Sequence, residues 1–346
     1  MNKKSLRLPG FSFFSALAFG VLVIVLGGPA AQALTLSPPA IEFSVVPGNQ
    51  AEFVVKLYNE GTEKQQLFAE ATTFTASADE GIPAYDFTAP KEDIATWLKF
   101  DTAPIVLEPQ GRKEVIVTVN VPADAPPGGH YGVVAFSTTP ASGANKPQVS
   151  IAQGVGTLLL VRIEGDVKES AMVTAFGITA GRSNRLPLTF TTAYKNTGNI
   201  HLKPTGTVTI TDMFKRSAVT LTVNQTKAST LPQSTRNYSV LWEKSTAQTT
   251  AGNAWAAFWQ EYRNERSNFA FGKYMATLAL TAGQSNGVVT SATTTFWVFP
   301  WHVVLVWAVV LVLILLLLIL LVKRYNHWVI AKAQSGNNQN PPAGTA

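Results

Sequence analysis

One short run of the sequence has the spacing of a catalytic nucleophile. Gly283, Ser285 and Gly287 fit the G-x-S-x-G pattern, in which a serine on a tight strand-to-helix turn attacks an acyl group with the help of a histidine. Here the pattern lies between the runs TLALT and VVTSATTTF, both of which are typical of strands. We therefore interpret it as a hairpin turn and expect no nucleophile at Ser285.

The other residues that could do chemistry are few and scattered. Outside the segments that flank the apolar run near the carboxyl end, the histidines are His130 and His201, and neither has an HExxH neighbour. The acidic pairs at 79–80 and 92–93 lack EF-hand spacing and indicate solvated loop charge. The chain has no cysteine, which excludes disulfides and thiolate ligands. We predict a protein without catalytic residues, metal sites or cofactors.

The longest apolar stretch lies near the carboxyl end. Residues 303–322 read VVLVWAVVLVLILLLLILLV and contain no charged, amide or hydroxyl side chain. As an α-helix, such a stretch spans about 30 Å, the thickness of the hydrocarbon core of a bilayer. A buried core helix would instead need apolar neighbours on every side, and only a short polar tail follows. We predict one transmembrane helix over 301–322.

The amino end has the three parts of a secretory signal. Residues 1–33 begin with a basic segment, continue through an apolar stretch at 11–26, and end in Ala31, Gln32 and Ala33, a small-x-small cleavage pattern. The segment is either cleaved after Ala33 or kept as a first anchor. In both cases we expect residues 34–300 to be translocated across the membrane.

The positive charge is concentrated at the two ends of the chain. Residues 34–300 hold 21 basic and 21 acidic side chains, so the formal net charge of +6 comes from the flanking segments. Lys323 and Arg324 directly follow the apolar run, which predicts a cytoplasmic tail over 323–346 by the positive-inside rule. This distribution indicates targeting and topology, and we expect no nucleic-acid partner.

Short apolar runs alternate with turn residues throughout 34–300. Val115, Val117 and Val119 fall on one face of a strand, and turn signals such as Pro47-Gly48 recur about every ten residues. This spacing is typical of antiparallel sandwiches. We predict an all-β chain of two tandem immunoglobulin-like β-sandwich domains, at 34–168 and 169–300, followed by the single transmembrane helix.

Two short sequence motifs occur in both predicted domains and support a repeated fold. Asn59-Glu60-Gly61 after Tyr58 is matched by Asn196-Thr197-Gly198 after Tyr194, and Gly129-His130-Tyr131 is matched by Gly272-Lys273-Tyr274. A Gly-x-Tyr that opens a late strand is typical of the tyrosine corner, in which the phenol bonds back to the chain. We therefore predict structural corners at Tyr131 and Tyr274.

The first predicted domain resembles a known family. The pattern LSPPAIEF…KLYNEG…LEPQG…VNVPADAPPGGHYGVV, over about 34–165, is similar to the amino-terminal domain of the WxL-interacting proteins of bacterial cell surfaces. The resemblance implies an immunoglobulin-like, membrane-anchored surface protein with peptidoglycan binding in this domain. The chain itself contains no Trp-x-Leu tripeptide, and residues 170–300 match the second domain of that family only loosely. The first domain also resembles periplasmic chaperone-like sandwiches.

Aromatic residues supply the candidate contact surfaces. Tyr85 and Trp97 lie in the irregular stretch 76–99, which we expect to form a loop over one edge. Four more aromatics have the i, i+3, i+4, i+7 spacing of a helix: Trp255, Phe258, Trp259 and Tyr262. This stretch forms either a helix or a long hairpin that caps one sheet, or an aromatic surface that lies in the membrane interface or contacts a partner.

The two predicted domains carry opposite charge. Residues 34–170 hold 17 acidic and 9 basic side chains, and residues 171–300 hold 4 acidic and 12 basic ones. A basic domain beside the membrane would lie against anionic headgroups or wall polymers, or else the two domains attract each other.

Together these features predict a non-catalytic, single-pass surface protein. It would bind cell-wall polymer (peptidoglycan) or a surface protein and tether it near the membrane. The alternative is an accessory or chaperone-like subunit of a secretion or pilus-assembly machine.

Overall fold

The computed structural model describes seven stretches of the chain: 34–76, 83–87, 89–139, 154–179, 185–246, 252–283 and 287–337. These residues form two compact units. Unit 1 contains the described residues from 34 to 168 together with 198–201, and unit 2 contains 169–197 and the described residues from 202 onward. The predicted signal segment 1–33 and residues 338–346 lie outside the described residues.

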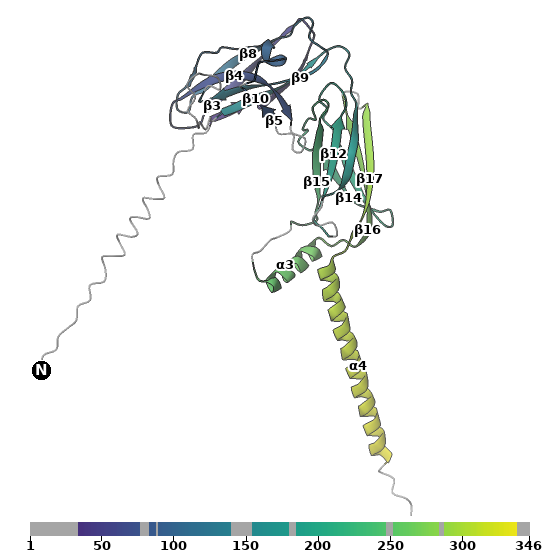
Figure 1. Cartoon of the computed structure of the whole chain (residues 1–346). Coiled ribbons are helices and arrows are strands. Elements are labelled where there is room, and N and C mark those ends of the chain that lie inside the picture. The colour runs from purple at the N-terminus through teal and green to yellow at the C-terminus, as the bar shows by residue number, and fades with distance from the viewer. Residues whose placement is uncertain are drawn as a thin grey trace, which may run out of the picture. The chain divides into compact units, whose positions relative to one another are not determined.

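Unit 1 is built from two sheets, and Figure 1 labels several of their strands. The four-stranded sheet has the order β1 (Leu34–Ser37), β3 (Gln50–Asn59), β8 (Arg112–Asn120) and β6 (Leu98–Lys99). The six-stranded sheet has the order β2 (Ala40–Val45), β10 (Gly154–Ile163), β9 (Gly128–Ser137), β4 (Gln65–Ala76) and β5 (Pro83–Tyr85), with β7 (Ile105–Leu107) paired to β4. The β2–β10 pair is parallel, and the other strand pairs are antiparallel.

The core of unit 1 forms from the inward faces of these strands. Val115, Val117 and Val119 on β8 are buried, as their alternation predicts, and they cluster with Val134 and Leu159 of the other sheet. The short helix α2 (Ile94–Trp97) adds Ile94 and Trp97 to the same cluster. The irregular stretch that the sequence suggested to be a loop over one edge therefore contributes to the core.

Unit 2 also contains two sheets. One has the order β11 (Ala171–Ile178), β12 (Leu188–Asn196) and β15 (Thr235–Trp242). The other has the order β14 (Ser217–Val223), β13 (Thr205–Asp212), β16 (Gly272–Ala282) and β17 (Val288–Val298). Aromatic side chains of both sheets meet in the core, where the ring centroids of Phe190 and Phe296 are 5.4 Å apart and those of Trp242 and Tyr274 are 5.2 Å apart.

The runs that flank the G-x-S-x-G pattern are the paired strands β16 and β17. Their antiparallel register ends at Ala282 opposite Val288, so the pattern connects two strands, as we interpreted it. Ser285 itself lies outside the described residues. The chain has a hairpin connection here, whereas a nucleophile elbow requires a helix after the turn.

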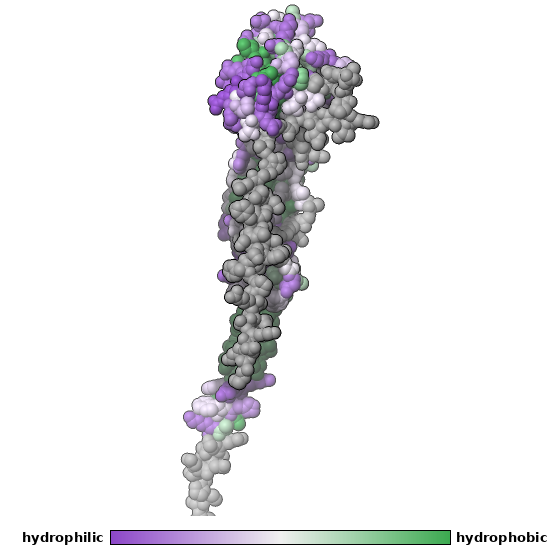
Figure 2. Space-filling model, turned by 90° about the vertical axis from the view of Figure 1, so that its left-hand side faces the viewer, coloured by the Kyte–Doolittle hydropathy of each residue, from purple (hydrophilic) through white to green (hydrophobic). Residues whose placement is uncertain are grey.

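Two longer helices belong to unit 2: α3 (Ala254–Ser267) and α4 (Trp301–Asn337). The helix α4 continues through the basic residues that follow the predicted membrane span 301–322, and no glycine or proline interrupts it before Gly336. The segment 301–332 is long and apolar enough to cross a membrane. Its apolar side chains are exposed along the described helix, and Figure 2 shows hydrophobic colour along the visible part of α4. The prediction of a mostly β chain with a carboxyl-terminal apolar helix is confirmed.

Candidate functional site

The aromatic run with helical spacing forms the helix α3. Asn253 precedes it, and its side-chain oxygen accepts a hydrogen bond from the backbone N–H of Ala256 at 2.9 Å, which caps the amino end. In Figure 1, α3 lies beside the beginning of α4. The predicted helix is therefore present, and it lies next to the helix that is long enough to cross a membrane.

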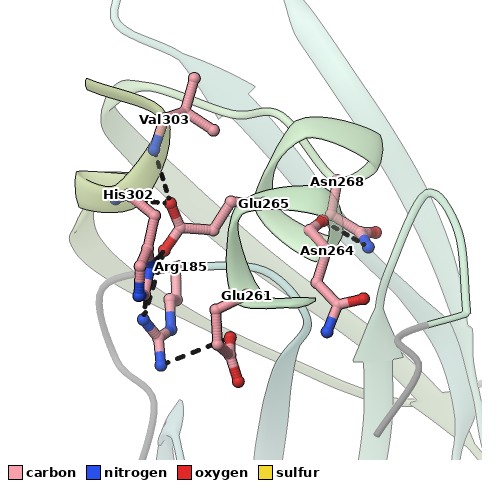
Figure 3. Close-up of polar contacts among 7 residues, drawn as sticks. All are labelled: Arg185, Glu261, Asn264, Glu265, Asn268, His302 and Val303. Carbon is pink, nitrogen blue, oxygen red and sulfur yellow. Dashed lines mark hydrogen bonds and ion pairs between the residues drawn. The ribbon is translucent and has the colours of Figure 1, made fainter. Parts of the chain in front are cut away.

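Glu265 joins α3 to α4. Its Oε2 accepts hydrogen bonds from the backbone N–H groups of His302 (2.9 Å) and Val303 (3.2 Å), as Figure 3 shows. Its Oε1 is 2.7 Å from His302 Nδ1, and since a carboxylate only accepts, that nitrogen carries the hydrogen. The first N–H groups of a helix have no partner within the helix and carry partial positive charge. Glu265, which is only 2% exposed, satisfies two of them from another element.

Arg185 balances the carboxylates on this side of α3. Its guanidinium nitrogens lie 3.2 Å from Glu265 Oε1 and 3.6 Å from Glu261 Oε2. Arg185 comes directly before the turn that leads into β12, so it ties the helix pair to the β-sheet part of unit 2. Burial of a charge is costly unless it is paired and hydrogen-bonded, and Glu265 meets both conditions.

A second attachment fixes the end of α3. The Asn268 side-chain oxygen accepts hydrogen bonds from the backbone N–H groups of Lys244 (2.8 Å) and Ser245 (2.9 Å), and its Nδ2 donates to the Ser245 carbonyl at 2.8 Å. The Lys244 ammonium also donates to the Phe269 carbonyl. Because 244–245 directly follow β15, α3 is fixed both to a sheet and to α4.

The four aromatic residues predicted on this helix form one cluster. Ring centroids are 5.8 Å apart for Trp255 and Trp259, 5.6 Å for Phe258 and Trp259, and 5.5 Å for Trp259 and Tyr262. Phe258 also packs against Trp301, with centroids 6.2 Å apart. Trp255 is 70% exposed and Trp301 is 45% exposed. The cluster is open to the outside at Trp255, its other three α3 residues are half-buried, and it reaches the first residue of α4.

Tyr85 and Trp97 do not form a common surface. Tyr85 is exposed at the end of β5, and its ring packs against Phe87 with centroids 5.2 Å apart. Trp97 is only 9% exposed, and its ring lies against the His130 ring with centroids 4.7 Å apart. The buried position of Trp97 gives it a packing role, so it does not offer its ring to a partner.

His130 and His201 both belong to unit 1 and make polar contacts within it. His130 Nδ1 is 2.5 Å from Asp93 Oδ1, and its Nε2 is 2.9 Å from the Pro126 carbonyl. Burial lowers the pKa of His130, but the hydrogen bonds to Asp93 and Pro126 and the charge of Asp93 outweigh it and raise the pKa above its ordinary value. His201 Nε2 is 2.8 Å from Glu42 Oε1.

The two predicted tyrosine corners have different contacts. The Tyr131 hydroxyl is 3.2 Å from His201 Nδ1, a side-chain partner, and burial raises the pKa of that phenol. Tyr274 packs its ring between Trp242 and Phe296, at centroid distances of 5.2 and 5.9 Å. Tyr274 therefore contributes mainly packing to the core of unit 2.

A groove of about 490 Å³ opens between β14 and β15 in unit 2. In the described part of the chain, β14 pairs only with β13 and β15 only with β12, so each strand turns an open edge to this side. The lining includes Leu221, Asn224, Arg236, Tyr238, Val240 and Leu241.

The polar side chains of this groove are held in place. Asn224 Nδ2 donates to the Pro204 and Ala228 carbonyls (2.8 and 2.9 Å), and Arg236 Nη1 donates to the Ser229 carbonyl (2.8 Å). Apolar parts of Leu221 and Leu241 remain accessible between them, and Leu241 is exposed. A groove of this size suits a short peptide or a comparable ligand.

The sequence did not point to the polar residues at the junction of α3 and α4. Glu265 is one of four acidic residues between 171 and 300, and it lies on the helix beside the aromatic face. The available signal was the scarcity of acidic residues in 171–300 together with the absence of an acidic residue from the first turn of α4, which leaves the helix start without a carboxylate of its own. The connection to Arg185 and His302 spans 80 and 37 residues, and only the fold brings them together. Among the described residues, no group of three or more histidine or acidic side chains could hold a metal ion.

Comparisons with known proteins give remote structural likenesses. No protein-family model matches the chain, and no curated protein matches it. The class 5 fimbriae chaperone CfaA is 10% identical, with 76% of this chain and 99% of that chain covered and a TM-score of 0.34. The E. coli chaperone DraB is 12% identical (78% and 96% covered, TM-score 0.32), and a PapD-like domain of human CEP192 is 16% identical (47% and 96% covered, TM-score 0.27). Likenesses at these scores do not identify a function.

Proposed function

We propose that this chain is a non-catalytic, membrane-anchored protein that holds a segment of a surface protein close to the membrane. In this proposal α4 crosses the membrane once, and the two units are immunoglobulin-like sandwiches outside it. Lys323 and Arg324 follow the apolar part of α4, which favours a cytoplasmic carboxyl end.

The groove between β14 and β15 is the observation that carries the binding role. Among the residues that the structure describes, both strands turn open edges to the groove, and an open edge can accept an extended segment as an additional strand. Exposed Leu241 offers an apolar contact to alternate side chains of such a segment. The basic balance of residues 171–300 favours a segment with acidic side chains.

Site-specific crosslinking tests the proposal. A photo-crosslinking amino acid replaces Leu241 in the groove. In the control it replaces Val289 on the edge strand β17, whose side chain is more exposed than that of Leu241. We expect adducts from Leu241 that map to one segment of one surface protein, and a synthetic peptide of that segment should abolish them. Equal adducts from both positions, or adducts that the peptide leaves unchanged, would refute the groove as the binding site.

A sedimentation assay with the purified protein tests the wall-polymer function that the resemblance to WxL-interacting proteins implies. Sedimentation with purified peptidoglycan separates the two ideas, because strand addition does not require the polymer. Retention by peptidoglycan that persists in a Leu241→Lys variant would favour the polymer function and place it away from the groove.

A further inference from the structure

The helix α3 is built in the opposite sense to a surface helix of a soluble protein. A surface helix normally turns apolar side chains to the core and polar ones to solvent. In α3 the buried residues are Gln260, Asn264 and Glu265, whereas Trp255 is the most exposed of its aromatic residues. The polar side of the helix therefore faces the protein, and the aromatic side is outward at Trp255 and half-buried at Phe258, Trp259 and Tyr262.

This outward face, which we call the aromatic face (Trp255, Phe258, Trp259 and Tyr262), is continuous with α4. Phe258 packs against Trp301 and against His302, with the latter centroids 5.1 Å apart. Beyond these residues α4 continues as an exposed apolar helix. A further pair of exposed rings, Phe271 and Phe299, lies in the segments next to α3 and α4, with centroids 5.8 Å apart.

We propose that α3 lies in the membrane interface, with its aromatic face against the lipid headgroups and the upper acyl chains. This inference rests on the proposed anchoring of α4, because a bilayer that contains the apolar part of α4 reaches the aromatic face through Trp301. Tryptophan and tyrosine favour this layer, since their rings are apolar and their N–H or O–H groups remain near water.

The charges on α3 fit an anionic lipid surface. The two carboxylates of the helix, Glu261 and Glu265, face Arg185 at 3.6 and 3.2 Å. Arg263 and Arg266 are exposed. Interfacial helices commonly combine an aromatic or apolar face with basic residues that attract anionic headgroups. Glu265 has a positioning role in this arrangement, because it fixes α3 to the first turn of α4 through the two backbone hydrogen bonds.

Fluorescence quenching by labelled lipids tests the inference on the full chain. The chain has no cysteine, so a single introduced cysteine carries the only thiol. The variants Trp255→Cys, Ala257→Cys and Leu318→Cys are labelled with one environment-sensitive fluorophore. They are then reconstituted into phosphatidylcholine–phosphatidylglycerol vesicles that contain lipids brominated at a shallow or a deep position of the acyl chain.

Ala257 is the matched control on the same helix. It is exposed, and two positions along an α-helix from Trp255 correspond to a rotation of about 200°, so it points away from the aromatic face. Leu318 lies within the apolar part of α4 and reports on the anchor. We expect loss of fluorescence at Trp255 with the shallow quencher, at Leu318 with the deep quencher, and little change at Ala257.

Each other outcome decides the matter. Quenching at Leu318 without quenching at Trp255 would overturn the interfacial position of α3 and leave the anchor intact. Equal quenching at Trp255 and Ala257 would overturn the proposed orientation of the aromatic face. Quenching at Trp255 without quenching at Leu318 would support α3 as a peripheral membrane helix and refute the anchor, and quenching at neither position would refute both.

Discussion

Each of the two units contains a histidine–carboxylate pair beside aromatic rings, and the two clusters have opposite arrangements. In unit 1 the aromatic residue Trp97 is buried, and the Asp93 side chain beside His130 is 41% exposed. In unit 2 Glu265 and His302 are buried, and the rings of Trp255 and Trp301 are exposed. The same residue types therefore form part of a core in one unit and an outward face in the other.

This difference shows that the surroundings of an aromatic residue decide its role. Trp97 lies on a short helix between strands, and the apolar cluster of both sheets encloses it. The rings of α3 project beyond the sheets, because Glu265 and Asn268 anchor the polar side of that helix to the rest of unit 2. Exposed aromatic residues that gather on one side of a helix typically mark a surface that contacts a membrane or a partner.

The largest effect should come from truncation of the buried ring. Trp97→Ala should lower the free energy of unfolding of unit 1 by about 4 kcal/mol, because it leaves a large cavity in a packed core. Chemical denaturation followed by hydrogen–deuterium exchange of the backbone amides of unit 1 measures this change, because all the other tryptophans of the chain lie outside unit 1. Tyr85→Ala is the control, since its ring is exposed; equal losses for both variants would contradict the difference in packing.

Removal of the buried carboxylate should have the next largest effect. Glu265→Ala should destabilise unit 2 by about 3 kcal/mol, because two N–H groups at the start of α4 lose their partner and Arg185 keeps only the longer contact with Glu261. Limited proteolysis of α3 in the purified full chain reports the loosened junction. Glu243→Ala, which removes an exposed carboxylate of the same unit, should leave the cleavage rate unchanged. Similar cleavage rates in both variants would argue against the structural role of Glu265.

A smaller, pH-dependent effect should come from His130 and its partly exposed partner Asp93 in unit 1. The pKa of His130 is raised above its ordinary value of 6.5 in the folded protein, so the charged imidazole stabilises unit 1 fully below pH 6.5. This stabilisation should decline as the pH rises through the folded-state pKa. Urea denaturation at a series of pH values measures it, and His130→Gln should flatten the profile in this range. An unchanged profile in that variant would assign the dependence to other groups.

The smallest change in stability should follow truncation of the outward ring. Trp255→Ala should alter the free energy of unfolding by no more than about 0.5 kcal/mol in detergent, since an exposed side chain loses little packing. The Trp97→Ala variant provides the comparison in the same assay. A loss of several kcal/mol at Trp255 would mean that the aromatic face packs against the protein and would remove the contrast between the two clusters.

Several parts of the structure could be predicted from the sequence because their cause is local. The alternation of Val115, Val117 and Val119 predicts a strand with one buried face, and the apolar run at 303–322 predicts a helix of membrane length. The helical spacing of the aromatics predicts α3 for the same reason. The helix α4 continues beyond the predicted membrane span, because a helix does not stop where hydrophobicity ends; it stops where backbone hydrogen bonding is interrupted.

Contacts between distant segments were decided only by the tertiary structure. The sequence offered Trp97 in an irregular stretch and Trp255 in a run with helical spacing as candidate contact residues, and only packing buried one ring and exposed the other. The pairing of Glu265 with Arg185 and with the first turn of α4, and the open edges of β14 and β15, depend on which segments the fold brings together. A local pattern reports the face that a residue occupies on its own helix or strand, whereas burial depends on what the remaining chain places against that face.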